Sequence, residues 1–148
     1  MKIIKVLLIL SILIIVSCAT TVVKQPTVHS RGALTPHRDS QFFVIGETLF
    51  GIPDIIADNL RENRFDVHTI TDIRDIPTSP RAERITQYII THEYDLVSDN
   101  GMWLLDIRIF EFNPRGTNNQ IALGTTTSSA STRTMVRAVM SRLIVMPF

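Results

Sequence analysis

Residues 88–112 read YIITHEYDLVSDNGMWLLDIRIFEF, and this stretch decides the fold. Apolar and polar side chains alternate from Met102 to Phe112, a pattern typical of a strand with one buried face. The residues from Tyr88 to Val97 predict a strand of their own. Asn100-Gly101 lies between the two runs and favours a type I′ turn, because both residues tolerate positive φ. We therefore expect an antiparallel hairpin.

A two-residue turn at Asn100-Gly101 also determines which residues face each other. On the face away from the core it sets Glu93 opposite Arg108, a favourable pair, and Asp95 opposite Asp106, a repulsive pair. Two interpretations of the repulsive pair stay open. Either this face is solvated and the repulsion is weak, or the loop is longer and the register differs.

The segments around the hairpin predict an α+β domain. Apolar residues recur at helical spacing from Ile52 to Leu60, and Pro53 suits the first turn of a helix. A β–α–β unit of this length implies parallel strands. Residues 71–84 read as a loop. Ser79-Pro80 could cap a helix over 81–90, but we expect at most one helical turn there before the strand from Tyr88. Gly124 would allow a bulge in the last strand.

The expected strands cover residues 41–46, 65–70, 88–97, 102–112 and 120–127, and the helices cover 52–63 and the residues beyond a cap at Ser129 or Ser131. The predicted fold is a single five-stranded mixed sheet, in the order β-α-β-β-β-β-α, with two helices packed on one face.

A different pattern occupies the first eighteen residues. Two lysines precede an apolar run from Val6 to Val16, which is eleven residues long. A membrane-spanning helix needs roughly 20 apolar residues, so the run fits the central region of a secretory signal peptide. The sequence Ile15-Val16-Ser17-Cys18 resembles a lipobox, the cleavage and acylation signal of bacterial lipoproteins. An ordinary signal peptide and an uncleaved anchor are the alternatives.

The resemblance to bacterial lipoproteins implies cleavage between Ser17 and Cys18 and a diacylglyceryl group on the Cys18 sulfur. Ala19 follows the cysteine in place of Asp, which implies the periplasmic leaflet of the outer membrane. On this interpretation residues 1–17 are a cleaved signal peptide. Residues 18–40 are the lipidated cysteine and a flexible tether rich in turn-forming residues, and 41–148 form one α/β globular domain.

The domain at 41–148 also resembles small uncharacterised proteobacterial outer-membrane lipoproteins with an α/β fold. The matching segments are Ile52-Pro53-Asp54-Ile55, Asn63-Arg64-Phe65-Asp66-Val67 and the alternation from Trp103 to Phe112. Those proteins carry a Trp-Asp pair near their third and fourth strands, where this chain has Asp95-Leu96. A surface site shared with them is therefore not expected at this position.

Charge and motif content exclude several functions. The domain from Gln41 onward contains ten arginines, no lysine and thirteen acidic residues, and the charges mix except in the last helix, which carries Arg133, Arg137 and Arg142. Nucleic-acid binders usually show a basic stripe or patch, so we expect no nucleic-acid partner. No Gly-x-Ser-x-Gly elbow, zinc-ligand spacing or phosphate-binding glycine loop occurs. His68 and His92 fall on predicted strands, where we expect structural roles. We expect no metal, no cofactor apart from the covalent lipid on Cys18, and no enzymatic activity.

The expected function is a binding or assembly module of the cell envelope, attached to the membrane by its lipid. Its partner would be an envelope protein or polymer. The partner would bind either on the uncovered sheet face or along a hydroxyl-rich edge at 125–129. The residues expected on the uncovered face are Glu93, Asp95, Asp106 and Arg108.

Two other functions stay open. One is a cell-envelope hydrolase in which Asp95 and Asp106 share a proton in a pocket. The other is a carrier of an apolar ligand, held in a cavity lined by Phe42, Phe110 or Phe112. The sequence leaves the oligomeric state and the identity of the partner open.

Overall fold

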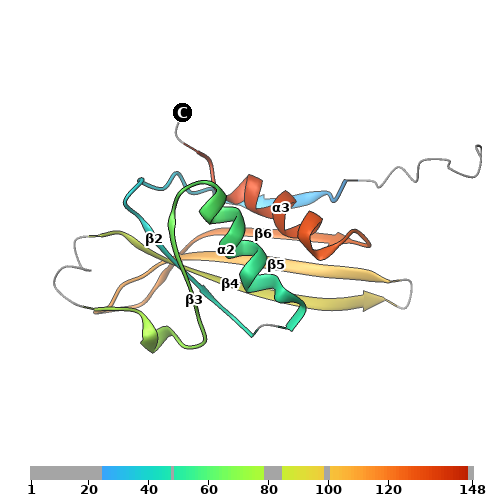
Figure 1. Ribbon diagram of the computed structural model, residues 1–148. Coiled ribbons are helices and arrows are strands. Elements are labelled where there is room, and N and C mark those ends of the chain that lie inside the picture. Colours follow the sequence, from blue (N-terminus) through green and yellow to red (C-terminus); the bar gives the residue numbers. More distant parts are fainter. Residues whose placement is uncertain (1–24, 48, 79–84, 99–100, 147–148) are drawn as a thin grey trace, which may run out of the picture.

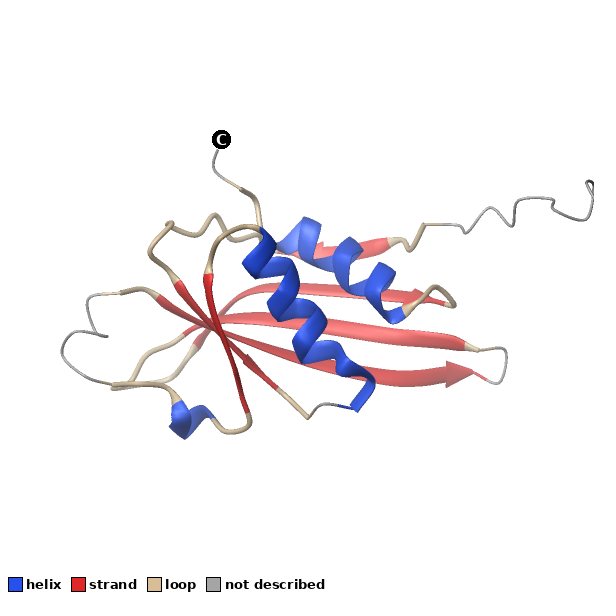
Figure 2. Ribbon diagram, viewed as in Figure 1, coloured by secondary structure: helices blue, strands red, loops and turns tan. Residues whose placement is uncertain are grey.

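The computed structural model describes residues 25–47, 49–78, 85–98 and 101–146. These residues form one mixed sheet with both α-helices on one of its faces (Figure 1 and Figure 2). The elements, in chain order, are β1 (Val28–Arg31), β2 (Gln41–Ile45), η1 (Leu49–Gly51), α2 (Ile52–Glu62), β3 (Asp66–Ile70), η2 (Ile73–Asp75), β4 (Gln87–Ser98), β5 (Met102–Glu111), β6 (Asn119–Ser128) and α3 (Thr132–Leu143). The expected α+β class, mixed sheet and helix-covered face are confirmed.

The sheet has six strands, in the order β1-β6-β5-β4-β2-β3, so the expected number of five was wrong. The additional strand, β1, lies within residues 18–40, which the sequence indicated as a tether. It pairs antiparallel with β6, with Val28 opposite Thr126. Further along the chain, Leu34 forms an isolated bridge with Ile144, at the end of α3. Four residues among turn formers carry too little periodicity to predict a strand.

The β–α–β unit is confirmed, because β2 runs parallel to β3 and also to β4. The helix between β2 and β3 has Pro53 in its first turn and Asp54 near its positive end, as its sequence predicts. Its apolar side buries Ile52, Ile56 and Leu60. This helix and α3 pack on the same face of the sheet and on each other.

The main core lies between the sheet and the two helices. Gly124 in β6 faces α3, where a Cβ would lie only 2.6 Å from Cγ1 of Val139. The glycine therefore allows the close packing of α3, whereas the irregularity of β6 lies nearer its start, opposite Ile109 and Phe110. The largest fully buried side chains of the core are Phe42, Ile52, Ile56, Leu60, Ile90, Leu105, Ile107, Ile109, Met135, Met140 and Leu143.

The β4–β5 hairpin is confirmed, but its register differs by two residues from the predicted one. Glu93 lies opposite Asp106, and Asp95 lies opposite Leu104. Three residues separate the ends of the strands, and the first two of them, 99 and 100, lie outside the described residues. The structure therefore has the longer loop of the two alternatives. A shift of two residues keeps every side chain on its predicted face, because side chains alternate with a period of two.

The loop after β3 covers one end of the face that carries no helix. Ile76 packs there on Phe43 and Ile89 in a second, smaller apolar cluster.

Hydrogen bonds from Arg74 hold the pKa of Asp72, which caps η2, at about 2. Residues 79–84, in which we expected the start of one helical turn, lie outside the described residues.

The turn from α2 into β3 places a non-glycine residue in the left-handed region. Arg64 has φ of 66°, and the next N–H, from Phe65, donates to the carbonyl of Leu60 at 3.3 Å. This hydrogen bond is that of a Schellman cap, in which glycine is the usual residue at the left-handed position. Arg64 therefore adopts this conformation at a steric cost of roughly 1–2 kcal/mol.

Arg64→Gly should raise the free energy of unfolding by about 1 kcal/mol, because glycine adopts positive φ without the clash of a Cβ. Urea unfolding followed by circular dichroism would show a higher midpoint with an unchanged slope. Arg64→Ala is the matched control, since it removes the same side chain but keeps the Cβ, and its midpoint should stay at the wild-type value. A glycine variant no more stable than the alanine variant would contradict this explanation.

Candidate functional site

Three of the four predicted site residues meet on the sheet face that carries no helix. The Arg108 guanidinium donates to both carboxylate oxygens of Glu93, at 3.1 and 3.0 Å. It also lies 3.7 Å from the Asp106 carboxylate. Because Glu93 and Asp106 are directly opposite in the sheet, Arg108 reduces a repulsion between like charges. We call these three residues the charged cluster.

The fourth predicted residue, Asp95, does not join the charged cluster. It is exposed and lies opposite Leu104, two positions further along the hairpin than Glu93. The predicted opposition of Asp95 and Asp106 is wrong because of the two-residue register shift. In contrast, the contact of Glu93 with Arg108 persists, because a shift of two residues turns directly opposed partners into diagonal neighbours within reach of long side chains.

Part of the hydroxyl-rich segment at 125–129 is covered by another strand. Strand β1 pairs with residues 123–126 of β6, and the Thr126 hydroxyl donates to the carbonyl of Thr27 at 2.8 Å. Thr126 is consequently buried, whereas Thr127 and Ser129 lie beyond the pairing with β1 and are exposed. Of the two partner-binding surfaces that the sequence left open, the uncovered face is intact and the hydroxyl-rich one is reduced to its last residues.

Neither alternative function finds the geometry that it requires. The hydrolase needs Asp95 and Asp106 to converge, and they are not opposed. The carrier needs a cavity between the sheet and the helices, lined by Phe42, Phe110 or Phe112. Phe42 is instead fully buried in the main core, whereas Phe110 and Phe112 pack in the small cluster on the other face. Within the described ranges, no three His, Cys, Asp or Glu side chains are grouped to hold a metal ion.

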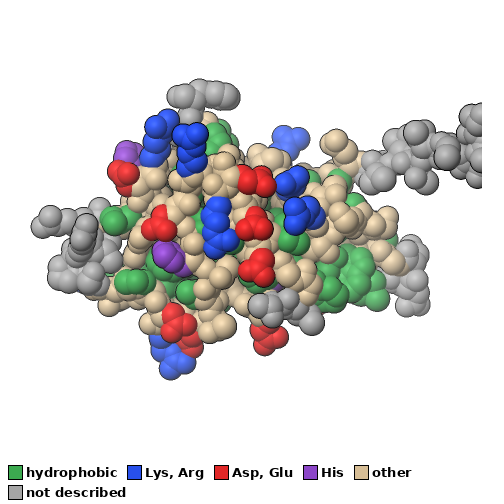
Figure 3. Space-filling view, viewed as in Figure 1, with side chains coloured by type: hydrophobic (Ala, Val, Ile, Leu, Met, Phe, Trp, Pro, Cys, Tyr) green, Lys and Arg blue, Asp and Glu red, His purple; other side chains and the backbone are tan. Residues whose placement is uncertain are grey.

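The sequence did not predict an exposed apolar surface at the hairpin end of the sheet. Tyr94 and Trp103 stack there with their ring centroids 4.7 Å apart, and Phe50 packs edge-on against both. Phe50 is 51% exposed, and Leu96 and Val97 are each 54% exposed. Figure 3 shows hydrophobic side chains gathered at this end of the molecule. We call these five residues the aromatic end.

The aromatic end exists because the strands are longer than the helices that cover them. Strand β4 has 12 residues and spans about 40 Å, whereas the 11 residues of α2 span about 17 Å. The hairpin consequently extends past both helices (Figure 2). Its residues Tyr94, Leu96 and Trp103 continue the core alternation where no helix covers them, so this length difference was the signal in the sequence that could have identified the surface.

The position of Phe50 depends on an unusual backbone. Its φ is 60°, in the left-handed region that bulky residues rarely adopt. This conformation turns the chain from η1 into α2 and brings the Phe50 ring over Tyr94 and Trp103. The Tyr94 hydroxyl lies 3.2 Å from the hydroxyl of Thr132 at the start of α3. The aromatic end is thus connected to both helices.

His92 lies behind the aromatic end, in a hollow of about 220 Å³ that Phe50 and Tyr94 also line. Gly46 lies so close that any Cβ at that position would collide with the imidazole ring. Burial lowers the pKa of His92, opposed by a hydrogen bond with the backbone at Ile45. Its Nδ1 has no partner among the described residues. These observations indicate a neutral, packed side chain.

The chain joins the sheet at the same end as the aromatic end. One row of residues crosses four neighbouring strands. Val28, the first residue of β1, is opposite Thr126 of β6, Thr126 is opposite Leu105 of β5, and Leu105 is opposite Tyr94 of β4. The residues before Val28 therefore lead away from the sheet beyond this row. Ser17 and Cys18, the predicted cleavage and lipidation residues, lie outside the described residues. Within the described part of the chain, no helix has the length and apolarity needed to cross a membrane.

Comparison with known proteins identifies the fold alone. No protein family and no curated protein matches this chain. PelC from Paraburkholderia phytofirmans, described as a dodecamer in two crystal forms, is 16% identical and has TM-scores of 0.51 and 0.50. Each match covers 80% of this chain and 97% of the PelC chain. A neuraminyllactose-binding hemagglutinin homolog from Helicobacter pylori is 10% identical, with a TM-score of 0.33, over 74% of this chain and 84% of its own.

Arg108→Ala should lower the free energy of unfolding by about 0.5–1 kcal/mol at low salt, because Glu93 and Asp106 then face each other without a cation. In 1 M salt the loss should shrink, since exposed charges are screened. The double variant with Arg108→Ala and Glu93→Gln should regain most of the lost free energy of unfolding, because residue 93 then carries no charge to repel Asp106. Urea midpoints measure all three effects. A loss that is equal at both salt concentrations would point to packing rather than charge.

Stability should fall as the pH drops from about 7 to about 5, and His92 should contribute to the fall. Its pKa is depressed in the folded state, so the unfolded chain binds a proton below its ordinary value of about 6.5 while the folded protein resists it. The contribution is therefore fully present above that value and is lost on acidification. His92→Gln, which does not titrate, should show a shallower dependence of the urea midpoint on pH. An unchanged dependence would exclude His92 as its source.

Proposed function

We propose that this chain is a lipid-anchored binding module of the cell envelope, attached through Cys18 to the periplasmic leaflet of the outer membrane and without enzymatic activity. One observation carries the proposal: the first residue of β1, from which the chain leads back to Cys18, lies in the same cross-strand row as Tyr94 of the aromatic end. A lipid on Cys18 would therefore draw this exposed apolar surface towards the bilayer.

The short distance between Cys18 and the sheet supports this orientation. Because β1 begins at Val28, only nine residues, 19–27, separate the lipidated cysteine from the first strand. The chain from Cys18 to Val28 reaches at most about 35 Å when fully extended. The domain is therefore held close to the membrane, more closely than a tether ending at residue 40 would hold it.

The chemistry of the aromatic end suits the boundary between lipid and water. Tryptophan and tyrosine are enriched there, since each has an apolar ring and a polar group that stays hydrated. Trp103 and Tyr94 provide these rings, and Leu96 and Val97 add aliphatic side chains that are more than half exposed. Contact with the bilayer would remove these four side chains from water.

The uncovered sheet face is then free to bind a partner beside the membrane. The charged cluster has two carboxylates and one guanidinium on this face, with the side chain of Glu93 58% exposed, that of Arg108 35% and that of Asp106 19%. We assign recognition to the cluster because Glu93 and Arg108 can be reached from solvent. Its excess of one negative charge suits an envelope protein or polymer that presents cationic or hydrogen-bonding groups.

The PelC chains that share this fold are described as dodecamers, which suggests another occupant for the aromatic end. An apolar surface of this kind could equally be buried between copies of the chain.

Trp103 is the single tryptophan of the chain, so its fluorescence reports on the aromatic end alone. In vesicles that contain brominated phospholipids, the lipidated protein should show strong quenching of this emission. Leu96→Ser combined with Val97→Ser should weaken the quenching without releasing the protein. Val145→Ser, at a residue that is 47% exposed outside the aromatic end, is the matched control and should change nothing.

Cys18→Ser tests the anchor separately and should release the protein from the membrane fraction. Unquenched Trp103 in a membrane-attached protein would contradict the orientation. If sedimentation of that protein also showed a large assembly with Trp103 buried, contact between copies would replace contact with the bilayer.

A further inference from the structure

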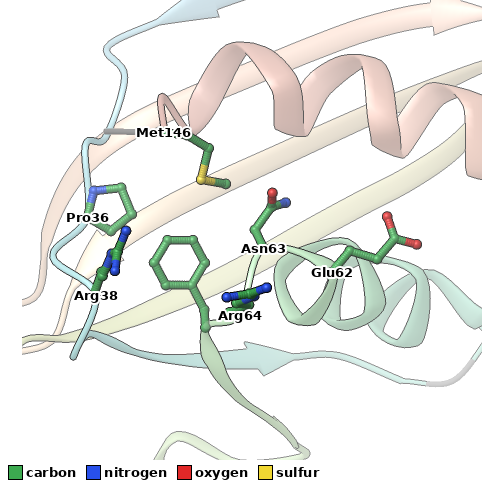
Figure 4. Close-up of a pocket in the computed structure, with 7 residues that line it drawn as sticks. Pro36, Arg38, Glu62, Asn63, Arg64 and Met146 are labelled. Atoms are coloured by element: carbon green, nitrogen blue, oxygen red, sulfur yellow. The ribbon is translucent and has the colours of Figure 1, made fainter. Parts of the chain in front are cut away.

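A second hollow, of about 390 Å³, lies at the opposite end of the sheet from the aromatic end. It forms where the segment before β2, the turn from α2 into β3 and the residues after α3 meet (Figure 4). Pro36, Phe65 and Met146 provide its apolar lining, and Arg38, Arg64 and Glu62 bring charge to it. Pockets of about 300–1,000 Å³ are the usual size for small ligands.

The charges at this hollow are unbalanced. Glu62 already pairs with Arg137 of α3, with Nη2 3.2 Å from Oε1. Within the described part of the chain, Arg38 and Arg64 form no hydrogen bond or ion pair through their side chains. Two exposed guanidinium groups from separate segments thus border the hollow without an ion-pair partner of their own.

The backbone at Arg64 adds an independent reason to expect a function. The position is left-handed, and glycine would occupy it without strain. Within the described residues, the arginine side chain makes no hydrogen bond or ion pair that would offset this strain. Strained residues persist where the side chain serves a role beyond folding, and binding is such a role.

We infer that this hollow binds a small anion with an apolar portion, such as an aryl or short acyl phosphate or carboxylate. Guanidinium groups bind such anions through paired, charge-assisted hydrogen bonds. Phe65, Pro36 and Met146 would cover the apolar portion. The hollow lies about nine residues of strand, roughly 30 Å, from the aromatic end. Its ligand therefore comes from the solution side, and the inference does not depend on the proposed function.

Phenyl phosphate is the probe, titrated calorimetrically into the purified full-chain protein, with the same buffer without protein as the blank. It should bind, whereas inorganic phosphate and the neutral phenyl glucoside should bind at least tenfold more weakly, because each lacks half of the recognised chemistry. Arg38→Gln and Arg64→Gly should each weaken phenyl phosphate at least tenfold. Arg142→Gln, in the last turn of α3 and away from the hollow, is the matched control and should keep the wild-type affinity.

Arg64→Gly makes the result decisive, because the variant should unfold at a higher urea concentration while losing the ligand. Weaker binding therefore cannot be attributed to a damaged fold. Three results would each overturn the inference: no binding of phenyl phosphate to the wild-type protein, equal binding of phenyl phosphate and phenyl glucoside or inorganic phosphate, and unchanged affinity in both arginine variants.

Discussion

The pairing of two long strands under two short helices controls the rest of this structure. Strands rise about 3.3 Å per residue and helices 1.5 Å, so elements of similar residue number differ about twofold in length. Near the middle of β4 and β5, the helices cover Leu105, Ile107 and Ile109 completely. Towards the hairpin the same alternation continues without cover, and Tyr94 and Trp103 must pack on each other and on Phe50. One geometric mismatch therefore produces both the core and the exposed aromatic surface.

Most of the fold could be predicted because its elements are strongly periodic. The spacing of Ile52, Ile56 and Leu60 identified α2, and the alternation after Met102 identified β5. Strand β1 could not be found in this way, since four residues acquire strand structure only by pairing with β6. The hairpin register was missed for a related reason: periodicity specifies which face a side chain occupies, and the loop decides its exact partner.

Less of the functional surface could be predicted, because it depends on contacts between distant segments. Glu93, Asp106 and Arg108 were found because they share one hairpin. Tyr94 and Trp103 were predicted to lie in the core because they share its face of the sheet. Side chains on that face are buried only where a helix covers them. Arg38, Arg64 and Met146 meet from three separate parts of the chain, and no pattern in the sequence relates them. The likeness to PelC adds the fold but no residue-level role, since one fold supports many functions.

The placement of β1 has a consequence for handling the protein. This short strand pairs with residues 123–126 in the middle of β6 and so interrupts what would otherwise be a ten-residue open edge. A chain shortened to begin at Gln41, the start of the domain as its sequence suggests, would lack that strand and the bridge from Leu34 to Ile144. Long unpaired edges recruit other strands, so such a fragment would tend to self-associate and precipitate. Fragments made for crystallisation or solution work should therefore retain the residues from 25 onward.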